Sequence, residues 1–150
     1  MKHLFYTLLF SLILFISCKD EEVDFITSND IEIMAYITEQ KLDAQKSETG
    51  LYYVIDNPGT GAQPTFSSDV TVRYKGYFLD GTVFDESDSN GTSFNLLQVI
   101  SGWTEGITYF KQGGNGILLV PAHLGYGNND YRGIPGGSVL AFDITLIKVK

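Results

Sequence analysis

Few side chains in this sequence are suited to covalent or metal chemistry, and those few do not cluster. His123 has no second histidine, no cysteine and no group of carboxylates near it in the chain, so a metal site is not indicated. No combination of serine or cysteine with histidine and a carboxylate supports a nucleophilic triad. The sequence is instead rich in aromatic residues, since 13% of its residues are Phe, Trp or Tyr. Such side chains can line an apolar binding pocket.

The single tryptophan is the most informative of these aromatic residues. Trp103 lies between Gly102 and Gly106, small residues that let neighbouring backbone approach closely. A lone Phe or Tyr in a strand is usually part of the core, so the other aromatic residues are weaker signals. Asp85 directly follows Phe84 near a turn, and is either a turn cap or a polar group of a site. The residue types alone leave both interpretations open.

These candidate residues lie mostly on predicted strands. After Gly50, short apolar runs alternate with turn residues, and residues 69–79 alternate between two faces as in a long strand. Asp80-Gly81 then predicts a hairpin turn, and a short helix is expected over residues 101–110. The other strands and apolar segments are expected over residues 51–55, 83–85, 94–99, 116–120 and 138–148. This pattern predicts an α+β fold in which an antiparallel sheet wraps around one short helix.

Five segments occur in the order, and near the spacing, of a known family. They are Val72-Arg73-Tyr74-Lys75-Gly76, Asp80-Gly81-Thr82-Val83-Phe84-Asp85-Glu86-Ser87, Val99-Ile100-Ser101-Gly102-Trp103-Thr104-Glu105-Gly106, Pro121-Ala122-His123-Leu124-Gly125-Tyr126-Gly127, and Ile134-Pro135 with Leu140-Ala141-Phe142-Asp143-Ile144. Residues 50–150 thereby resemble the FKBP family of peptidyl-prolyl cis/trans isomerases. The resemblance implies an FKBP-like fold, rotation about Xaa-Pro bonds in polypeptide clients, binding of macrolide-type inhibitors, and no cofactor.

The resemblance also implies which residues form the site. Trp103 would be the floor under the proline ring, while Asp85 and the Tyr126 hydroxyl would make polar contacts. Three aromatic side chains would be the walls: Tyr74, Phe84 and Phe142. Four further positions would bind substrate, the second of them through its backbone N–H: Val99, Ile100, Gly125 and Ile134. Phe94 is expected in the core rather than in the site.

Two loops depart from the family pattern. The loop at residues 87–93 lacks the family's basic residue and carries Thr92 where an aromatic is often seen, so a more polar and open rim is expected. In the second loop Gly133 stands where a bulky aliphatic residue would cover the proline. Tyr131 or Arg132 could substitute for that aliphatic residue.

The first residues have the character of an export signal. An apolar run preceding Ser17 is too short to span a bilayer comfortably but fits a signal-peptide core. Residues 1–17 are therefore expected to be removed. The stretch that ends at Cys18 resembles a bacterial lipoprotein cleavage site, so lipidation of Cys18 is expected. The alternatives are a secreted protein with a spare thiol and an uncleaved anchor.

A lipid on Cys18 would attach the chain to the bacterial cell envelope, at the outer membrane, facing the periplasm or the cell surface. Acidic residues follow within a tether of residues 18–27. They are either a solvated linker or an export signal like that of surface lipoproteins in Bacteroidetes.

A helix is expected from Ser28 to about Lys46, where Gly and Pro are absent, within a helical spacer of residues 28–49. Asn29 and Glu32 have the spacing of an N-cap and its reciprocal partner. An apolar stripe is expected on this helix, formed by Ile31, Met34, Ala35 and Leu42 and widened by Ile33, Tyr36 and Ile37. The helix therefore either packs on the domain and sets its distance from the membrane, or mediates dimerisation or client holding.

The formal net charge of −8 and the lack of a basic patch exclude binding to nucleic acid. A monomer is expected. The leading hypothesis is an isomerase that acts on exported, partly folded chains. The second is a peptide-binding surface lipoprotein without catalysis, since one fold can host either function. The third is a chaperone that acts mainly through the spacer helix, in which deletion of residues 25–47 would spare isomerisation.

Overall fold

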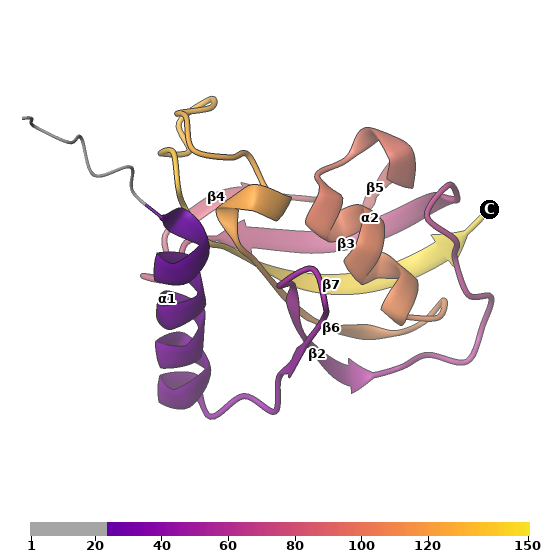
Figure 1. Ribbon diagram of the computed structural model, residues 1–150. Helices are drawn as coiled ribbons and strands as arrows, with labels where there is room; N and C mark the ends of the chain where they lie inside the picture. Colours follow the sequence, from indigo (N-terminus) through magenta and orange to yellow (C-terminus); the bar gives the residue numbers. More distant parts are fainter. Residues whose placement is uncertain (1–23) are drawn as a thin grey trace, which may run out of the picture.

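A computed structural model of the protein describes residues 24–150, in which a twisted antiparallel sheet is the central element (Figure 1). The elements in chain order are α1 (Phe25–Gln40), β1 (Gln45–Lys46), β2 (Tyr52–Asn57), β3 (Asp69–Tyr77), β4 (Val83–Glu86), β5 (Thr92–Asn95), the 3-10 turn η1 (Leu96–Gln98), α2 (Ser101–Gly106), η2 (Ile107–Tyr109), β6 (Asn115–Val120), η3 (Ala122–Leu124) and β7 (Leu140–Val149). The predicted signal peptide, Cys18 and most of the predicted tether lie outside the described residues.

The sheet confirms the predicted α+β architecture. Its strand order is β1-β2-β6-β7-β3-β4, with β5 also paired to β3, and neighbouring strands are antiparallel. The first half of β3 pairs with β5 and the second half with β4, so one long strand supports two shorter ones. Along β3 the side chains of Val70 and Val72 are buried while Arg73 and Lys75 are exposed. This alternation is the one expected for a strand with one face on the core.

The short helix α2 packs closely on one face of the sheet because it carries two glycines. A Cβ atom at Gly102 would lie 2.6 Å from the Val120 side chain, and one at Gly106 would lie 2.7 Å from Leu118. Real Cβ atoms do not approach so closely, so any larger residue would push the helix away from the sheet. The close approach places Trp103 in the main core, among buried apolar side chains of β3, β6 and β7.

The helix α1 covers the other face of the sheet. Ile33 is fully buried in a second cluster with Tyr52, Leu119 and Ala141, whereas the neighbour Leu118 belongs to the core under α2. Successive residues of a strand point to opposite faces, so the two clusters lie on opposite sides of the sheet. In Figure 1 α1 stands at one end of the strands and α2 lies near their middle.

The predicted start of α1 is wrong. The N-cap is Asp24, whose carboxylate accepts hydrogen bonds from the backbone N–H groups of Ile26 (3.1 Å) and Thr27 (3.3 Å). A carboxylate in this position satisfies N–H groups that have no partner within the helix. The helix therefore begins at Phe25, one turn earlier than predicted, and Asn29 lies inside it.

The predicted end of α1 is also wrong, since the helix stops at Gln40 rather than near Lys46. Lys41 adopts a left-handed conformation with a φ of 54°, and the N–H of Leu42 donates to the carbonyl of Ile37 at 3.0 Å. Such an ending is usually marked by glycine, because a side chain disfavours positive φ. Lysine gives no such signal in the sequence.

The predicted apolar stripe of α1 is confirmed in part: Ile33 is buried and Tyr36, Ile37 and Leu42 pack against its cluster, whereas the other three members face solvent. Ile31 is 65% exposed, Met34 is 50% exposed, and Ala35 is exposed as well. The fully buried positions are Ile33 and, one turn earlier, Asn29, which the stripe did not include. Within residues 24–150 no helix is long and apolar enough to cross a membrane.

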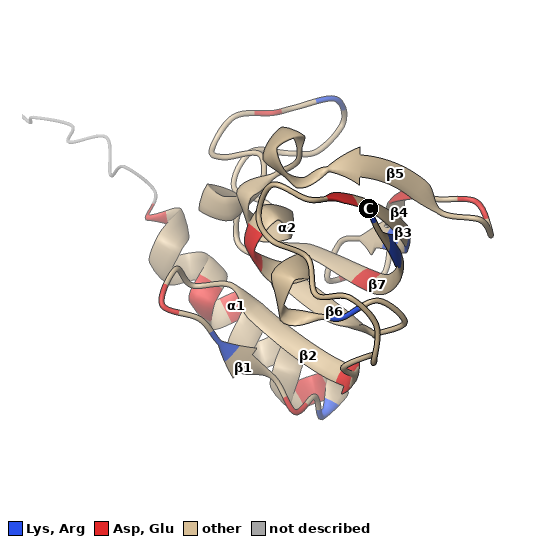
Figure 2. Cartoon of the chain, turned by 90° about the vertical axis from the view of Figure 1, so that its right-hand side faces the viewer, with Lys and Arg blue, Asp and Glu red and all other residues tan. Residues whose placement is uncertain are grey.

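The remaining boundaries shift by a few residues. The strand predicted at 51–55 occupies 52–57, and the α-helix predicted at 101–110 ends at Gly106 and continues as a 3-10 turn. The apolar segment at 94–99 divides between β5 and η1. Acidic residues are spread over α1 and the loops and outnumber the basic ones (Figure 2).

Candidate active site

A cavity of about 370 Å³ opens beside α2. Its lining comes from β3, β4, β5, η1, α2 with the segment before it, the loop before β7, and β7 itself: Tyr74, Phe84, Asp85, Phe94, Gln98, Val99, Ile100, Trp103, Tyr126, Tyr131 and Phe142. The fold thus brings together all six positions predicted as catalytic, although they are spread over residues 74–142. Val99 and Ile100 join them. This volume lies within the range of roughly 300–1,000 Å³ that small-ligand sites occupy.

Aromatic rings stand upright around Trp103. Its ring centroid lies 5.0 Å from that of Tyr74, with an interplanar angle of 86°. The distances to Phe94 and Phe142 are both 5.4 Å, with angles of 81°. Edge-to-face contacts of this kind are the favoured geometry of aromatic pairs. The indole therefore forms the base of a box whose sides are other rings.

Packing alone holds the indole in place. Trp103 is 4% exposed, and among the described residues its Nε1 is the buried side-chain donor that has no hydrogen-bond partner. A tryptophan buried in the core usually pairs its N–H. The ring position is therefore determined by its apolar neighbours and by the close approach of α2.

The sheet register positions the walls. Gly76 pairs with Phe142 on β7 and with Asp85 on β4, so these two residues flank the same point of β3. Phe84 then contacts Phe142 edge to face, with a centroid distance of 5.6 Å and an angle of 90°. Phe84 and Asp85 are adjacent and both line the cavity, because the pairing of β4 with β3 shifts register after Gly76 and leaves Phe84 without a partner on β3. Asp85 is exposed at the rim.

One hydrogen bond links a wall of the cavity to its carboxylate. The hydroxyl of Tyr74 donates to Oδ2 of Asp85 at 2.8 Å. Burial raises the pKa of Tyr74, and the hydrogen bond to Asp85 raises that pKa further. Burial also raises the pKa of Tyr126, with smaller contributions from Tyr131 and Asp85. Both hydroxyls therefore keep their protons at neutral pH and can act as hydrogen-bond donors.

The backbone before α2 contributes a further donor. Ile100 is the N-cap residue of α2, and its carbonyl accepts from the N–H of Trp103 at 2.9 Å. Within residues 24–150 the N–H of Ile100 donates no hydrogen bond to the protein. An N–H at a helix start that lines an open cavity can bind a carbonyl oxygen of a ligand.

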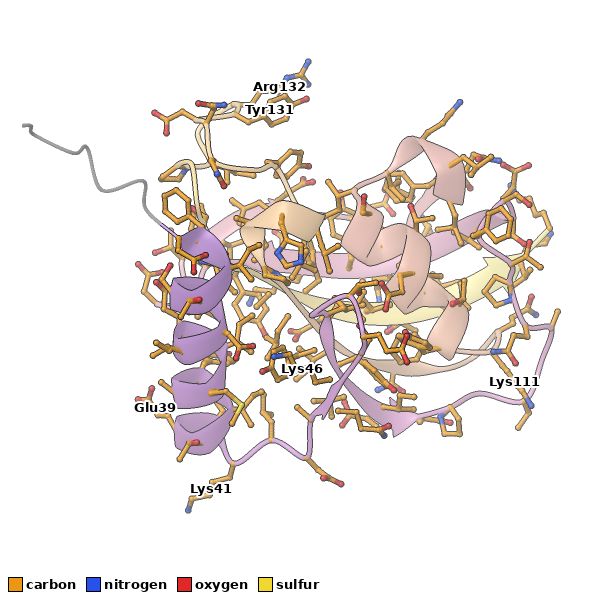
Figure 3. All side chains as sticks on the ribbon, in the orientation of Figure 1. Glu39, Lys41, Lys46, Lys111, Tyr131 and Arg132 are labelled. Atoms are coloured by element: carbon orange, nitrogen blue, oxygen red, sulfur yellow. The ribbon has the colours of Figure 1, made fainter. Side chains whose placement is uncertain are left out.

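Two tyrosines form one side of the rim. The rings of Tyr126 and Tyr131 stack, with centroids 4.7 Å apart and an interplanar angle of 11°. The guanidinium of Arg132 lies 5.4 Å from the centre of the Tyr131 ring, a cation–π contact. Tyr131 and Arg132 project from the tip of the loop between η3 and β7 (Figure 3). Of the two side chains named as substitutes for the missing aliphatic residue, Tyr131 lines the cavity.

Two predicted substrate-binding residues lie away from the cavity lining. Ile134 is 8% exposed and belongs to the core cluster, and Gly125 neighbours the Leu140 side chain. Conversely, Phe94 lines the cavity rather than lying only in the core. In the structure Phe94 pairs with the inward-facing Val70 and so points to the same face of the sheet. Gln98, at the end of η1, carried no recognisable signal.

His123 contributes to structure. Its Nε2 lies 2.8 Å from the carbonyl oxygen of Thr49. In the part of the chain that the structure describes, no group of three or more His, Cys, Asp or Glu side chains could hold a metal ion.

Comparisons with known proteins agree with this geometry. The family model described as FKBP-type peptidyl-prolyl cis-trans isomerase matches residues 61–147. The FKBP-type peptidyl-prolyl cis-trans isomerase FkpA of Buchnera aphidicola subsp. Schizaphis graminum is 44% identical over 108 residues, which are 70% of this chain and 43% of that protein. FkpA of Escherichia coli K12 is 45% identical over 106 residues, 69% of this chain and 39% of that protein. The chain therefore spans about two fifths of the length of these relatives.

Solved structures have the same fold. The crystal structure of FkpA from Escherichia coli superposes with a TM-score of 0.74 at 38% identity, covering 83% of this chain and 61% of that one. The crystal structure of AtFKBP13 superposes with a TM-score of 0.66 at 28% identity, covering 72% of this chain and 99% of that one.

Proposed function

The chain belongs to the family of FKBP-type peptidyl-prolyl cis-trans isomerases, and from this premise we propose that it catalyses rotation about Xaa-Pro bonds in exported polypeptides. The observation that carries the proposal is the aromatic cavity, which has room for a proline ring and gathers Trp103, Asp85 and Tyr126 with the wall residues. Family membership alone would leave open whether the site is intact. The chain spans about two fifths of the length of the curated relatives it matches, so its activity has to be argued from its own residues.

The reaction needs neither a nucleophile nor a metal. Amide resonance opposes rotation by roughly 18–20 kcal/mol, and the uncatalysed Xaa-Pro reaction takes tens to hundreds of seconds. No covalent bond forms or breaks. The catalyst must instead bind the twisted amide more tightly than the planar one. The twisted amide has lost conjugation and its carbonyl is less polar, so apolar aromatic walls suit it better than water does.

We assign the apolar part of the task to the box around Trp103. The proline ring would lie on the indole, between the rings of Phe84 and Phe142. In this placement the imide bond stays at the mouth of the cavity, where the polar groups are. Removal of water from the ring would supply binding energy that does not depend on the client's other residues.

We assign the polar part to three groups. The free N–H of Ile100 would bind a client carbonyl, and the Tyr126 hydroxyl would donate a second hydrogen bond. Asp85, fixed by the Tyr74 hydroxyl, would place negative charge beside the twisting amide. These donors and the carboxylate would act together by holding the carbonyl out of the plane of its nitrogen.

An isomerisation assay on the purified protein tests the proposal. The variant Asp85→Leu should lower kcat/KM for an Xaa-Pro peptide, with Asp143→Leu as the matched control. Asp143 is also an exposed strand carboxylate that accepts from a tyrosine, here Tyr77 at 2.9 Å, but it does not line this cavity. Circular dichroism would establish that both variants fold.

The outcomes distinguish two functions. Acceleration that falls only in Asp85→Leu would support the isomerase. A folded wild-type protein that binds prolyl peptides without accelerating rotation would support the second hypothesis, a peptide-binding protein. Two features motivate this second hypothesis: the polar loop at residues 87–93 and the exposed side chain of Tyr131. Binding can be followed by fluorescence, since Trp103 is the single tryptophan and lines the cavity. The same signal would report macrolide-type inhibitors, which we propose as further ligands.

We also propose that the protein is a lipoprotein anchored through Cys18 to the bacterial envelope, after removal of residues 1–17. Support comes from the sequence pattern at the N-terminus. Cys18→Ala should release the protein from the membrane fraction, since stable anchoring depends on acyl chains. A variant that still sediments with membranes would contradict the lipid anchor. Three points stay predictions: the side of the outer membrane that the protein faces, the start of the isomerase domain at residue 50, and the monomeric state.

A further inference from the structure

The buried side chain of Asn29 connects α1 to the loop that forms the rim of the cavity. Asn29 is 1% exposed, and it is the buried polar residue among those that the structure describes. Its Nδ2 donates to the carbonyl of Gly137 at 2.9 Å. Its Oδ1 accepts from the N–H of Ala122 at 2.8 Å. One amide thus satisfies a backbone group at each end of the segment that contains Tyr126 and Tyr131.

These two bonds are part of a closed ring of hydrogen bonds. The carbonyl of Ala122 accepts from the N–H of Gly127 at 2.8 Å, and the carbonyl of Gly127 accepts from the N–H of Gly137 at 2.9 Å. Ala122 and Gly137 each use one backbone group to bond to Gly127. Asn29 bonds to the other backbone group of each, the N–H of Ala122 and the carbonyl of Gly137. The ring fixes the backbone next to Tyr126, whose side chain lines the cavity.

α1 makes a second contact with the end of the rim loop, at Gly137. Gly137 has a φ of +79°, and a Cβ atom there would collide with the ring of Phe25. The first turn of α1 therefore packs directly on the Gly137 backbone. One turn after Asn29, Ile33 packs in the cluster on the sheet, and its apolar side chain takes no part in the ring of hydrogen bonds. The helix has one part that binds the rim loop and one part that covers the sheet.

We propose that Asn29 is a positioning residue for the isomerase site, acting through the rim loop, and this proposal rests on the proposed function. The rim tyrosines are exposed, and the loop that carries them is anchored by Ile134 in the core and, at its base, by the ring of hydrogen bonds. Loss of the Asn29 amide would leave the Ala122 N–H and the Gly137 carbonyl without their partner in a buried place. The loop would then sample other positions, and Tyr126 and Tyr131 would meet the client less often in the productive geometry.

The test compares Asn29→Ala with Ile33→Ala in the purified full chain. Both variants remove a buried α1 side chain, but only the first breaks the ring. Displacement of a positioned group by about 1 Å can cost up to about 100-fold in rate, so we expect kcat/KM to fall at least about 10-fold in Asn29→Ala. Ile33→Ala should lower the thermal midpoint while keeping kcat/KM near that of the wild type, measured where both variants are folded by circular dichroism.

Two further measurements separate positioning from stability. In a background lacking both rim tyrosines (Tyr126→Ala, Tyr131→Ala), Asn29→Ala should no longer change kcat/KM, although it should still lower stability. Amide hydrogen exchange should be faster at Gly127 and Gly137 in Asn29→Ala but not in Ile33→Ala.

The milder Asn29→Asp, which keeps an acceptor for the Ala122 N–H, replaces Asn29→Ala should that variant not fold. It should leave the Ala122 amide protected and accelerate exchange at Gly137. Equal losses of kcat/KM in the Asn29 and Ile33 variants, or unchanged exchange at Gly127 and Gly137, would overturn the proposal. A wild-type protein without isomerase activity would refute the proposed function, whereas the exchange comparison would still decide whether Asn29 holds the loop.

Discussion

Substitution of Tyr74 by phenylalanine tests whether the carboxylate at the cavity rim has to be held in place. The change removes one hydroxyl, which donates to Asp85 at 2.8 Å, and keeps the ring that forms an edge-to-face contact with Trp103. The shape of the cavity should therefore be preserved. The carboxylate of Asp85, exposed at the end of β4, would become free to rotate into solvent.

The magnitude follows from the place of this bond. A hydrogen bond to a charged group contributes about 1.5–3 kcal/mol when removed from water, but exposed pairs contribute about 1 kcal/mol or less. Asp85 is exposed, so Tyr74→Phe should cost at most about 1 kcal/mol of unfolding free energy. We expect a larger effect on catalysis, a fall in kcat/KM of about 10-fold. Such a fall corresponds to a loss of about 1.4 kcal/mol of transition-state stabilisation.

The control is Tyr77→Phe, on the same strand. Its hydroxyl donates to Asp143 at 2.9 Å, and it belongs to the cluster under α1 rather than to the cavity. Isomerisation of an Xaa-Pro peptide and urea unfolding should be measured for both variants. We expect similar stability losses and a fall in kcat/KM for Tyr74→Phe alone. If kcat/KM changes equally in the two variants, the Tyr74–Asp85 bond does not position the site and the reasoning is refuted.

Three further outcomes are expected. Trp103→Ala should lower the unfolding free energy by about 3–5 kcal/mol in urea denaturation, since a buried indole is lost, and no hydrogen bond of the described residues is lost with it. Tyr131→Ala should raise KM and leave kcat and stability nearly unchanged, because an exposed rim ring changes stability by only about 0.5 kcal/mol or less; an unchanged KM would exclude contact with the client. Burial raises the pKa of Tyr74, Tyr77 and Tyr126, so their protonated forms are favoured in the folded protein. Stability should therefore be complete below their ordinary pKa of about 10 and decline as the pH rises above it, which urea midpoints at about pH 8 and about pH 11 would detect.

The sheet could be predicted because its signals are local. The alternation along β3 and the turn after it depend on adjacent residues, and a strand with period two keeps its buried face whatever its partner is. The position of Phe94 in the cavity could not be predicted, because its pairing with Val70 appears only in the folded sheet. Family motifs brought the rest of the predicted site together from distant strands, which periodicity alone could not do.

The face of α1 could not be predicted in this way. The predicted stripe was too wide: it contained Ile33, which is buried, but also Ile31 and Met34, which are exposed, and it left out Asn29. The buried side is set by backbone groups near residues 122 and 137, which lie about 100 residues later in the chain. A polar side chain can be buried there because both halves of its amide are satisfied. The burial of Asn29 therefore becomes evident only when its hydrogen-bond partners in the folded chain are known.

These contacts also bear on the third hypothesis, in which deletion of residues 25–47 spares isomerisation. That deletion would expose the outer face of the sheet, including Leu119 and Ala141, which are fully buried under α1. It would also remove the partner of the Ala122 N–H and the Gly137 carbonyl, and with it the ring that holds the rim loop. The strand residues next to Leu119 and Ala141 are Leu118 and Phe142, which face the cavity side, so disorder on one face would be transmitted to the other. A helix that served only as a spacer could be deleted without loss of activity, whereas the packing of α1 predicts that catalysis and stability would decline together.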